Sequence, residues 1–187
     1  TVAALKRREV YATSGPRISV HFFGGWNFNA SDAMAPDLAV IGYKKGVPMG
    51  GDLSTAPSGK SPTFLLSAVK DPLGANLDRI QVIKGWLDSA GVTHEKIYNI
   101  ALSDDRTPNQ PVASTVDLKT ASYINTIGSS HFNRVWTDAD FDPTLRAFYY
   151  VRVLEIPTPR WTAYDELKFK VKMPDQVPKI VQDRAYT

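Results

Sequence analysis

Three aspartates at alternate positions form the densest group of residues able to do chemistry in this chain. Asp138, Asp140 and Asp142 stand in the segment Thr-Asp-Ala-Asp-Phe-Asp-Pro. Alternate carboxylates can converge on one hard cation such as Ca²⁺, but the segment lacks the Gly and the distal Glu of an EF-hand loop. Asp side chains also cap tight turns. The sequence therefore favours a solvated turn with Asx-type caps and leaves the three aspartates as secondary metal candidates.

The three histidines do not form a metal-ligand pattern. His21, His94 and His131 lie far apart and share no H-x-H or H-x-x-x-H spacing, whereas a zinc or binuclear site needs several converging His and carboxylate ligands. The chain also lacks the phosphate-binding motifs G-x-G-x-x-G and G-x-x-x-x-G-K and the serine motif G-x-S-x-G. The residues predict no catalytic group and no resident cofactor, so the chain is not expected to be an enzyme by itself.

The composition is that of an ordinary globular chain with little net charge. Of 187 residues, 43% are hydrophobic and 22% are charged, and the formal net charge is +3. This small, mixed charge argues against nucleic acid as a partner. The absence of cysteine excludes disulfides and thiolate chemistry, and it leaves the compartment open. No apolar run reaches the ~18–20 residues of a membrane-spanning helix, so no membrane segment is expected.

The segment 146–156 predicts the strand around which the other elements must be arranged. Read with a period of two, it is apolar on both faces, one beginning at Phe148 and the other at Tyr149. Such a strand is typically central in its sheet and covered on both sides. Arg152 interrupts the Phe148 face, so its guanidinium either meets a buried partner or lies where that face opens to solvent. The two prolines that closely follow Ile156 cannot donate to a ladder, and pairing is expected to stop there.

Several more segments have the alternation and the β-branched or aromatic content of strands. The predicted strands are residues 17–23, 63–69, 79–87, 96–102, 132–137 and 147–156. Short strands separated by turn signals indicate an antiparallel sandwich. The turn at residues 71–76 is expected to join its two neighbouring strands as a hairpin. The predicted fold is mainly β, with β-sandwich-like antiparallel sheets, an N-terminal helix and one or two short inserted helices.

Three segments carry helical signals. Residues 1–12 have a helical apolar face and late basic residues, and the following Ser-Gly-Pro is expected to end that helix. Residues 32–46 predict an inserted helix, with Pro36 at its first position and Gly46 as its C-cap. Residues 161–174 contain a capping box at 162–165 and then alternate with strand periodicity. We expect a short helix there that passes into an extended edge segment.

Five stretches together resemble one protein family. The longest are Gly74-Ala-Asn-Leu-Asp-Arg-Ile-Gln-Val-Ile-Lys-Gly-Trp-Leu-Asp88 and Phe148-Tyr-Tyr-Val-Arg-Val-Leu-Glu-Ile-Pro-Thr-Pro-Arg-Trp161, and the others are residues 5–18, 22–26 and 46–53. They are similar to the C-terminal part of bacterial proteins grouped as domain of unknown function 3604. These proteins are relatives of the polymerase-and-histidinol-phosphatase (PHP) class of metal-dependent hydrolases. The resemblance covers nearly the whole chain.

The resemblance implies a longer polypeptide in which a preceding domain is catalytic and this chain is not. The metal-binding His and Asp residues of such proteins belong to a preceding α/β barrel-like domain, which would hold the divalent metal and hydrolyse phosphoesters. Residues 1–16 would be the terminal helix and exit segment of that domain, and residues 17–187 a β-rich C-terminal domain with a helical insertion at about 32–46. By comparison with the family, the chain is expected to be truncated at both ends. A periplasmic or secreted location is expected from the family alone.

Two functions remain open from the sequence. In the first, the chain is a non-catalytic domain that packs on the catalytic domain and shapes its substrate entrance through Ser14, Arg17 and the loop ending at Asp52. Arg17 would meet an anionic substrate group, since guanidinium binds phosphate or carboxylate oxygens in pairs; alternatively, Arg17 pairs with a surface carboxylate. In the second, the chain is an independent module that binds carbohydrate or protein. An uncovered apolar face beside residues 1–12 would favour the first, and a contiguous platform of exposed Trp and Tyr the second.

Overall fold

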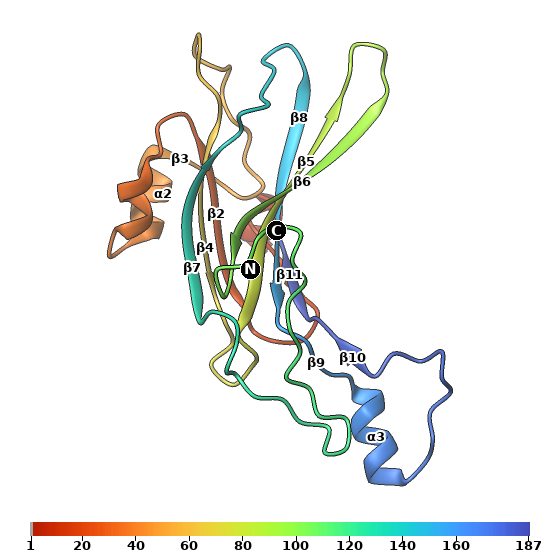
Figure 1. Cartoon of the computed structure of the whole chain (residues 1–187). Coiled ribbons are helices and arrows are strands. Elements are labelled where there is room, and N and C mark those ends of the chain that lie inside the picture. Colours follow the sequence, from red (N-terminus) through yellow and green to blue (C-terminus); the bar gives the residue numbers. More distant parts are fainter. Residues whose placement is uncertain (1) are drawn as a thin grey trace.

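The chain folds into a sandwich of two antiparallel sheets that face each other (Figure 1). The computed structural model describes residues 2–187. Its strands are β1 (Ala12–Thr13), β2 (Ser19–Gly25), β3 (Gly46–Pro48), β4 (Thr63–Val69), β5 (Leu77–Leu87), β6 (Thr93–Leu102), β7 (His131–Thr137), β8 (Arg146–Glu155), β9 (Thr158–Pro159), β10 (Ile180–Val181) and β11 (Arg184–Tyr186). One sheet has the strand order β1-β11-β8-β5-β6 and the other β3-β2-β4-β7. The predicted mainly-β class is confirmed.

The hydrophobic core lies between the two sheets. Alternate residues of each strand point inward because successive side chains of a strand leave opposite faces. The four-stranded sheet contributes Val20, Phe22, Phe64, Leu66, Ala68 and Phe132, and the five-stranded sheet contributes Leu77, Ile80, Val82, Ala101, Val151, Val153 and Ala185. Each of these side chains is buried. The period-two pattern read from the sequence therefore locates the core.

Strand β8 is central in the five-stranded sheet, as predicted, and lies between β5 and β11. On its inward face, Val151 and Val153 are buried. On the opposite face Phe148 is 63% exposed, Tyr150, Arg152 and Leu154 are half-buried, and Ile156 is buried. The expected burial on both sides is therefore wrong toward the start of the strand and holds only at its end. Arg152 does find a partner, because its Nε donates a hydrogen bond to Oε1 of buried Gln81 (2.8 Å).

The predicted helix over residues 32–46 is two shorter helices. A 3₁₀ helix, η1 (Ala30–Met34), ends where Ala35 turns to an extended conformation, and α2 (Leu38–Lys45) begins after Asp37. The residue before a proline is pushed out of the helical region, so Pro36 separates the helices rather than starting one. The side chain of Asp37 caps α2 by accepting from the Val40 amide (3.0 Å), and Gly46 is its C-cap, as predicted.

The N-terminal helix is much shorter than predicted. Helix α1 (Val2–Lys6) ends before Arg8, which adopts a left-handed conformation with φ of 60°. The chain then becomes extended and forms β1, which pairs with β11. The predicted helix over residues 1–12 is therefore wrong beyond Lys6, because a strand partner from the other end of the sequence takes this segment. Thr1 lies outside the described residues.

Of two expectations about connections, one is wrong and the other holds in part. The turn at residues 71–76 is not a hairpin, since β4 belongs to the four-stranded sheet and β5 to the five-stranded sheet; it carries the chain from one sheet to the other. The hairpin is instead formed by β5 and β6. Strand β8 ends at Glu155, before the prolines, as predicted, but Thr158 and Pro159 then pair with β10 in a separate two-stranded ladder. Proline has no amide hydrogen to donate, and the ladder beside Pro159 is completed by the Arg160 amide, which donates to the Lys179 carbonyl (2.8 Å).

The segment 161–179 contains a helix and no strand. Helix α3 (Trp161–Phe169) follows Arg160, which makes no side-chain cap. The predicted capping box is absent because the Thr162 hydroxyl donates to the Pro178 carbonyl instead (2.8 Å). Lys170 ends the helix in a left-handed conformation with φ of 55°, and residues 170–179 contain no strand. The helical half of the prediction is confirmed and the extended edge segment is wrong.

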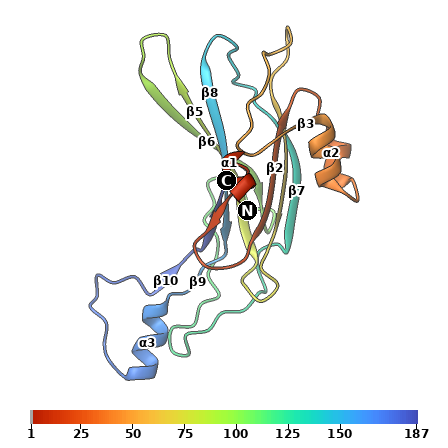
Figure 2. The ribbon, with the colours of Figure 1, turned by 180° about the vertical axis from the view of Figure 1, so that it is seen from behind.

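The two ends of the sandwich differ. At one end the β5–β6 hairpin and the start of β8 extend past the four-stranded sheet, and at the other end α3 projects on the side of the five-stranded sheet (Figures 1 and 2). Helix α2 lies on the opposite side, where a second cluster of Phe23, Phe28 and Leu65 is buried. None of the helices described in residues 2–187 is long and apolar enough to cross a membrane.

The contact between α2 and the four-stranded sheet makes a testable prediction at Gly42. A methyl group at this position would overlap the ring of Phe23. In an exposed helix, Gly→Ala stabilises by about 1 kcal/mol, but here we expect Gly42→Ala to lower the free energy of unfolding by about 1–3 kcal/mol through overpacking. Chemical denaturation measures the change. Val40→Ala on the exposed face of α2 is the control, and a stabilising Gly42→Ala would contradict the packing.

Candidate functional site

The three residues predicted to shape a substrate entrance have separate partners. Ser14 Oγ donates to Asp183 Oδ1 (2.6 Å) and accepts from the Arg184 amide (3.0 Å), which ties the segment after β1 to β11. Asp52 pairs with Arg8 (3.0 Å) at the surface. No hydrogen bond or ion pair within residues 2–187 joins Ser14, Arg17 and Asp52, so they do not form one contact cluster.

Arg17 has the carboxylate partner that the alternative interpretation expected. Its backbone amide donates to Asp71 Oδ2 at 2.7 Å, and its Nε lies 3.5 Å from the same oxygen. The Arg17 amide and the Leu73 amide hold the pKa of Asp71 below its ordinary value. The Arg17 side chain is 77% exposed, so most of its guanidinium still faces solvent.

The three alternate aspartates do not converge on one point. Asp138 is buried, Asp140 is exposed and pairs with Lys96 (2.5 Å), and Asp142 accepts from the amide and hydroxyl of Thr144. Residues 2–187 contain no group of three or more His, Asp or Glu placed to hold a metal ion. The expected Asx-type caps are present at Asp138 and Asp142, but the expectation of a solvated turn is wrong for Asp138.

The histidines also stay apart. His94, on the β5–β6 hairpin, stacks on Trp86 with ring centroids 5.2 Å apart and bonds Asp88 (2.7 Å). His21 and His131 both line a groove of about 540 Å³ on the outer face of the four-stranded sheet. They come from β2 and β7, the two strands on either side of β4, and they belong to no group of three or more possible metal ligands within residues 2–187.

A buried ion pair lies where the hydrophobic core ends. Lys84 Nζ donates to Asp138 Oδ2 (2.6 Å) and to the Asp140 carbonyl (2.8 Å), and the Tyr149 hydroxyl donates to the same Asp138 oxygen (2.6 Å). The Lys84 and Asp138 side chains are 6% and 0% exposed. Sequence analysis missed this pair, although the signal existed: Lys84 continues the inward face of β5 after Val82.

Aromatic rings pack beside the pair, with Lys84 Nζ 5.6 Å from the Trp86 ring centroid and 5.8 Å from that of Tyr149. Phe64 lies 4.6 Å from Tyr149, and Tyr98 lies 4.8 Å from Trp136, measured between ring centroids. Burial raises the pKa of Tyr149 and of Tyr98, and hydrogen bonds to Asp138 and Asp140 add to the effect. Both phenols are therefore neutral O–H donors over the physiological range.

Next to the ion pair is a cavity of about 320 Å³, which we call the polar pocket. It is lined by Lys84, Trp86, Lys96, Tyr98, Asp140, Asp142, Leu145 and Ala147. Lys96 holds the pKa of Asp140 below its ordinary value, and the Thr144 hydroxyl does the same for Asp142. Both carboxylates are therefore ionised near neutral pH, and the pocket combines fixed donors, fixed acceptors and two aromatic rings.

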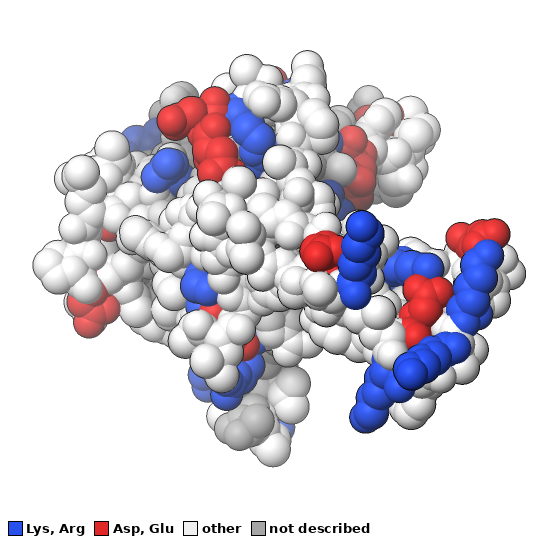
Figure 3. Space-filling view, turned by 60° about the horizontal axis from the view of Figure 1, so that its bottom comes forward, with Lys and Arg blue, Asp and Glu red and all other residues white. Residues whose placement is uncertain are grey.

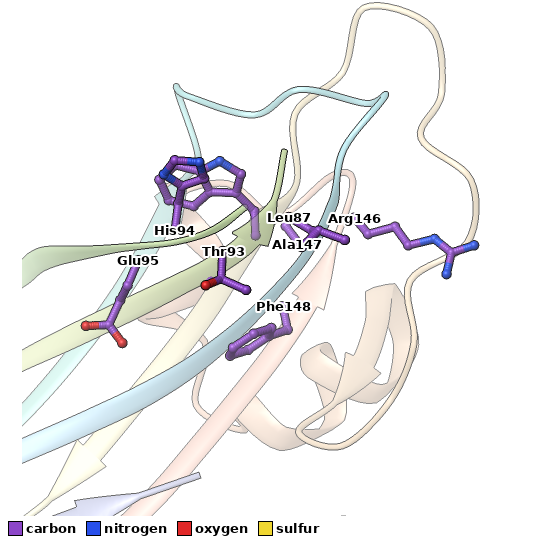
Figure 4. Close-up of a pocket in the computed structure, with 9 residues that line it drawn as sticks. Leu87, Thr93, His94, Glu95, Arg146, Ala147 and Phe148 are labelled. Carbon is purple, nitrogen blue, oxygen red and sulfur yellow. The ribbon is translucent and has the colours of Figure 1, made fainter. Parts of the chain in front are cut away.

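A second cavity, of about 590 Å³, lies on the uncovered side of the five-stranded sheet (Figure 4). Phe148 lies over Gly85, where any Cβ would overlap its ring, and it packs near Tyr150 with ring centroids 6.5 Å apart. Ile83 and Ile97 pair on this same face. We call the set Ile83, Leu87, Ile97, Phe148 and Tyr150 the outer apolar face.

Charged side chains do not gather into a single basic surface in the view from the α3 end. Figure 3 shows Lys and Arg standing beside Asp and Glu, with wide uncharged areas between them. In α3 and the segment after it, ion pairs join Lys179 to Glu166 (2.6 Å) and Lys172 to Asp175 (3.4 Å). The absence of a nucleic-acid partner stays a prediction from the weak, mixed charge.

One buried carboxyl has an oxygen that no hydrogen bond satisfies within residues 2–187. Glu155, at the end of β8, is 2% exposed, and its Oε1 accepts no hydrogen bond within the described chain. Burial, followed by the negative charges of Asp183 and Asp71, raises the pKa of Glu155 to about 7. An unpaired buried carboxylate is costly, so this side chain is neutral over much of the acidic range.

The sheets and cavities define the chain as an antiparallel β-sandwich domain with a polar pocket at one end and an uncovered apolar sheet face. The chain belongs to the family described as "Protein of unknown function (DUF3604)", whose family model matches residues 1–187. This confirms the family resemblance seen in the sequence. No match was found among curated proteins or among solved structures.

The buried pair makes a prediction about stability. Removing one partner of a buried ion pair leaves the other charge uncompensated, so Lys84→Met should lower the free energy of unfolding by about 3–5 kcal/mol. The double variant Lys84→Met/Asp138→Asn should recover much of this loss. Lys96→Met, at the exposed pair with Asp140, is the matched control and should change stability far less. Equal effects of the two single variants in urea unfolding would contradict the burial of Lys84.

Glu155 makes a prediction about pH. Its pKa in the folded chain exceeds its ordinary value of 4.5, so between pH 4.5 and 7 the folded state holds more protons than the unfolded state, and stability falls as pH rises. Glu155→Gln should therefore stabilise the protein by roughly 1–2 kcal/mol at pH 8 and by much less at pH 5. Thermal unfolding at both values tests this, with exposed Glu95→Gln as control. A gain that does not depend on pH would contradict the assignment.

Proposed function

We propose that this chain is a non-catalytic C-terminal domain that packs on a preceding catalytic domain of the same polypeptide, a PHP-like metal-dependent hydrolase, and shapes its substrate entrance. The divalent metal would be held by that catalytic domain. The observation that carries the proposal is the outer apolar face of the five-stranded sheet. The family itself is described as one of unknown function, so the link to the PHP class rests on the sequence resemblance.

The outer apolar face has the composition of a sheet surface that packs against another layer. Ile83 is only 1% exposed because its neighbours cover it, but Phe148, Ile97 and Leu87 are 63%, 46% and 43% exposed. Contiguous exposed apolar surface of this kind is typical of an interface. Strands apolar on both faces are normally covered on both, and a neighbouring domain would supply the second cover.

The N-terminal segment has exposed apolar side chains, as expected of a segment that packs against a preceding catalytic domain. Helix α1 buries none of its residues, and Val2 and Leu5 are 68% and 60% exposed. Val10 and Tyr11, just before β1, are also exposed. A helix with no buried side chain gains little from the sandwich, so its apolar side is available to a preceding domain.

Arg17 and Asp52 keep the role of entrance residues in this proposal. Arg17 holds a largely exposed guanidinium against Asp71, and exposed ion pairs of this type are worth little. An anionic substrate group could therefore displace the contact with Asp71 at small cost. Asp52 pairs with Arg8 beside the N-terminal segment, which brings the loop before it close to the proposed entrance.

The alternative of an independent module with a flat aromatic platform has less support. Trp136 is half-buried against Tyr98 and Phe64, and Trp161 is exposed on α3. Trp86 lies on the hairpin, at the opposite end of the molecule from α3 (Figure 1). The three tryptophans do not form one contiguous surface.

Side-chain footprinting tests the proposed packing. In this chain alone, hydroxyl radicals should oxidise Phe148 readily, and in a form extended at its N-terminus through the preceding domain, labelling of Phe148 should fall severalfold because the ring is covered. Met34 of η1, which is 85% exposed on the side of the four-stranded sheet, should be labelled equally in both forms. Equal labelling of Phe148 in both forms would contradict docking on this face.

A hydrolysis assay tests whether catalysis belongs to the preceding domain. With added divalent metal, the extended form should hydrolyse a generic phosphomonoester or phosphodiester, and residues 1–187 alone should not, because the described part of the chain brings no metal-ligand group together. Arg17→Ala in the extended form should raise KM more than it lowers kcat. Chelator-sensitive activity in the short chain would contradict the assignment of catalysis to another domain.

A further inference from the structure

We propose that the polar pocket at the hairpin end of the sandwich binds a neutral sugar ring. The pocket lies on the inward side of β5 and β6, next to the Lys84–Asp138 pair. It faces away from the outer apolar face, because Lys84 and Trp86 alternate with Ile83 and Gly85 along β5. The proposal is therefore independent of docking at that face.

The charges around the pocket favour a neutral ligand. Two ammonium groups, Lys84 and Lys96, stand against three carboxylates, those of Asp138, Asp140 and Asp142. Each ammonium is already paired with a carboxylate, at 2.6 Å for Lys84 and 2.5 Å for Lys96. A phosphate or a carboxylate ligand would add negative charge where it is already in excess, and a cation would meet both lysines.

The pocket still offers uncommitted hydrogen-bonding groups of both kinds. Within residues 2–187, Lys84 Nζ uses two of its three N–H donors. Asp140 accepts its bonds through Oδ2 and Asp142 through Oδ1, which leaves the other oxygen of each free. A sugar hydroxyl both donates and accepts, so neighbouring hydroxyls of one ring can bind a carboxylate oxygen and an ammonium together.

The shape and walls of the pocket suit a ring of this size. Its volume of about 320 Å³ is at the lower end of the range of ~300–1,000 Å³ for small-molecule sites. Trp86 and Tyr98 line the pocket. The ring surface that His94 leaves open on Trp86, and that Lys96 and Trp136 leave open on Tyr98, can pack against the C–H face of a sugar. Aromatic walls with a few converging polar groups are the usual composition of such sites.

The site is also held rigid before any ligand arrives. Lys84 is fixed by Asp138 and by the Asp140 carbonyl, and Asp140 is fixed by Lys96 and Tyr98. Preorganised groups lose little conformational entropy on binding. A ligand that needs only the remaining donors and acceptors therefore does not have to break the buried pair.

A panel of neutral and acidic sugars tests the proposal. Glucose, galactose, mannose, xylose and N-acetylglucosamine are titrated beside glucuronate, galacturonate and phosphate, and binding is followed by nitrogen–proton correlation spectra and calorimetry. At least one neutral sugar should bind with a Kd of about 1 mM or tighter and shift the indole signal of Trp86. The matching uronate should bind at least about tenfold more weakly.

Variants separate this pocket from other surfaces. Trp86→Ala and Asp140→Asn should each raise the Kd by about tenfold or more, and Trp161→Ala on α3 should leave it unchanged. Asp140→Asn keeps the shape of the side chain, so it remains informative if Trp86→Ala loosens the hairpin. The proposal is overturned if no neutral sugar binds, if the uronates or phosphate bind more tightly, or if Asp140→Asn leaves binding unchanged.

Discussion

The ion pair between Lys84 and Asp138 closes the sandwich at the end that the hydrophobic core does not reach. Lys84 comes from β5 of the five-stranded sheet, and Asp138 follows β7 of the four-stranded sheet, so the pair joins the two layers directly. Elsewhere apolar side chains hold the sheets together. Burying two charges costs free energy that only good geometry returns, and this makes the relative position of the two sheets more specific than apolar contact alone would.

The surroundings of this pair depend on it. Tyr149 binds the same carboxylate oxygen as Lys84, and the backbone of Asp140 binds both members of the pair. The contact between Lys84 and Asp138 therefore fixes the position of the buried lysine that lines the polar pocket. If Lys84 swung out to solvent, Asp138 would lose its main counter-charge and the pocket would lose its buried donor.

Much of the fold could be predicted because the strands carry their own pattern. The alternation of Ile80 and Val82 in β5 and of Val151 and Val153 in β8 locates the buried faces, and all six predicted strands exist with small shifts at their ends. The separation of β4 from β5 into different sheets could not be predicted, since turn residues do not reveal which strand is the partner. Helix α1 was overestimated for the same reason, because β11 captures residues 12–13 from the far end of the sequence.

The sequence indicated the acidic residues of the candidate site but not their partners. The aspartates at 138, 140 and 142 were singled out by their spacing, but their partners, Lys84, Lys96 and Tyr149, are distant in the sequence. Spacing reports which carboxylates could converge, whereas pairing with lysines depends on the sheet register. A single lysine that continues an otherwise apolar strand face, as Lys84 does after Val82, is the local signal that would have indicated a buried pair.

The pairing of β1 with β11 has a mechanical consequence. These strands are antiparallel, with Ala12 opposite Tyr186 and Thr13 opposite Ala185, and the two ends of the chain lie close together (Figures 1 and 2). Tension applied through both ends would therefore pull β1 away from β11 one residue pair at a time, like a zipper, rather than shear the whole ladder at once. The first contacts beyond the two pairs to carry the load would be those of Ser14 with Asp183 and Arg184.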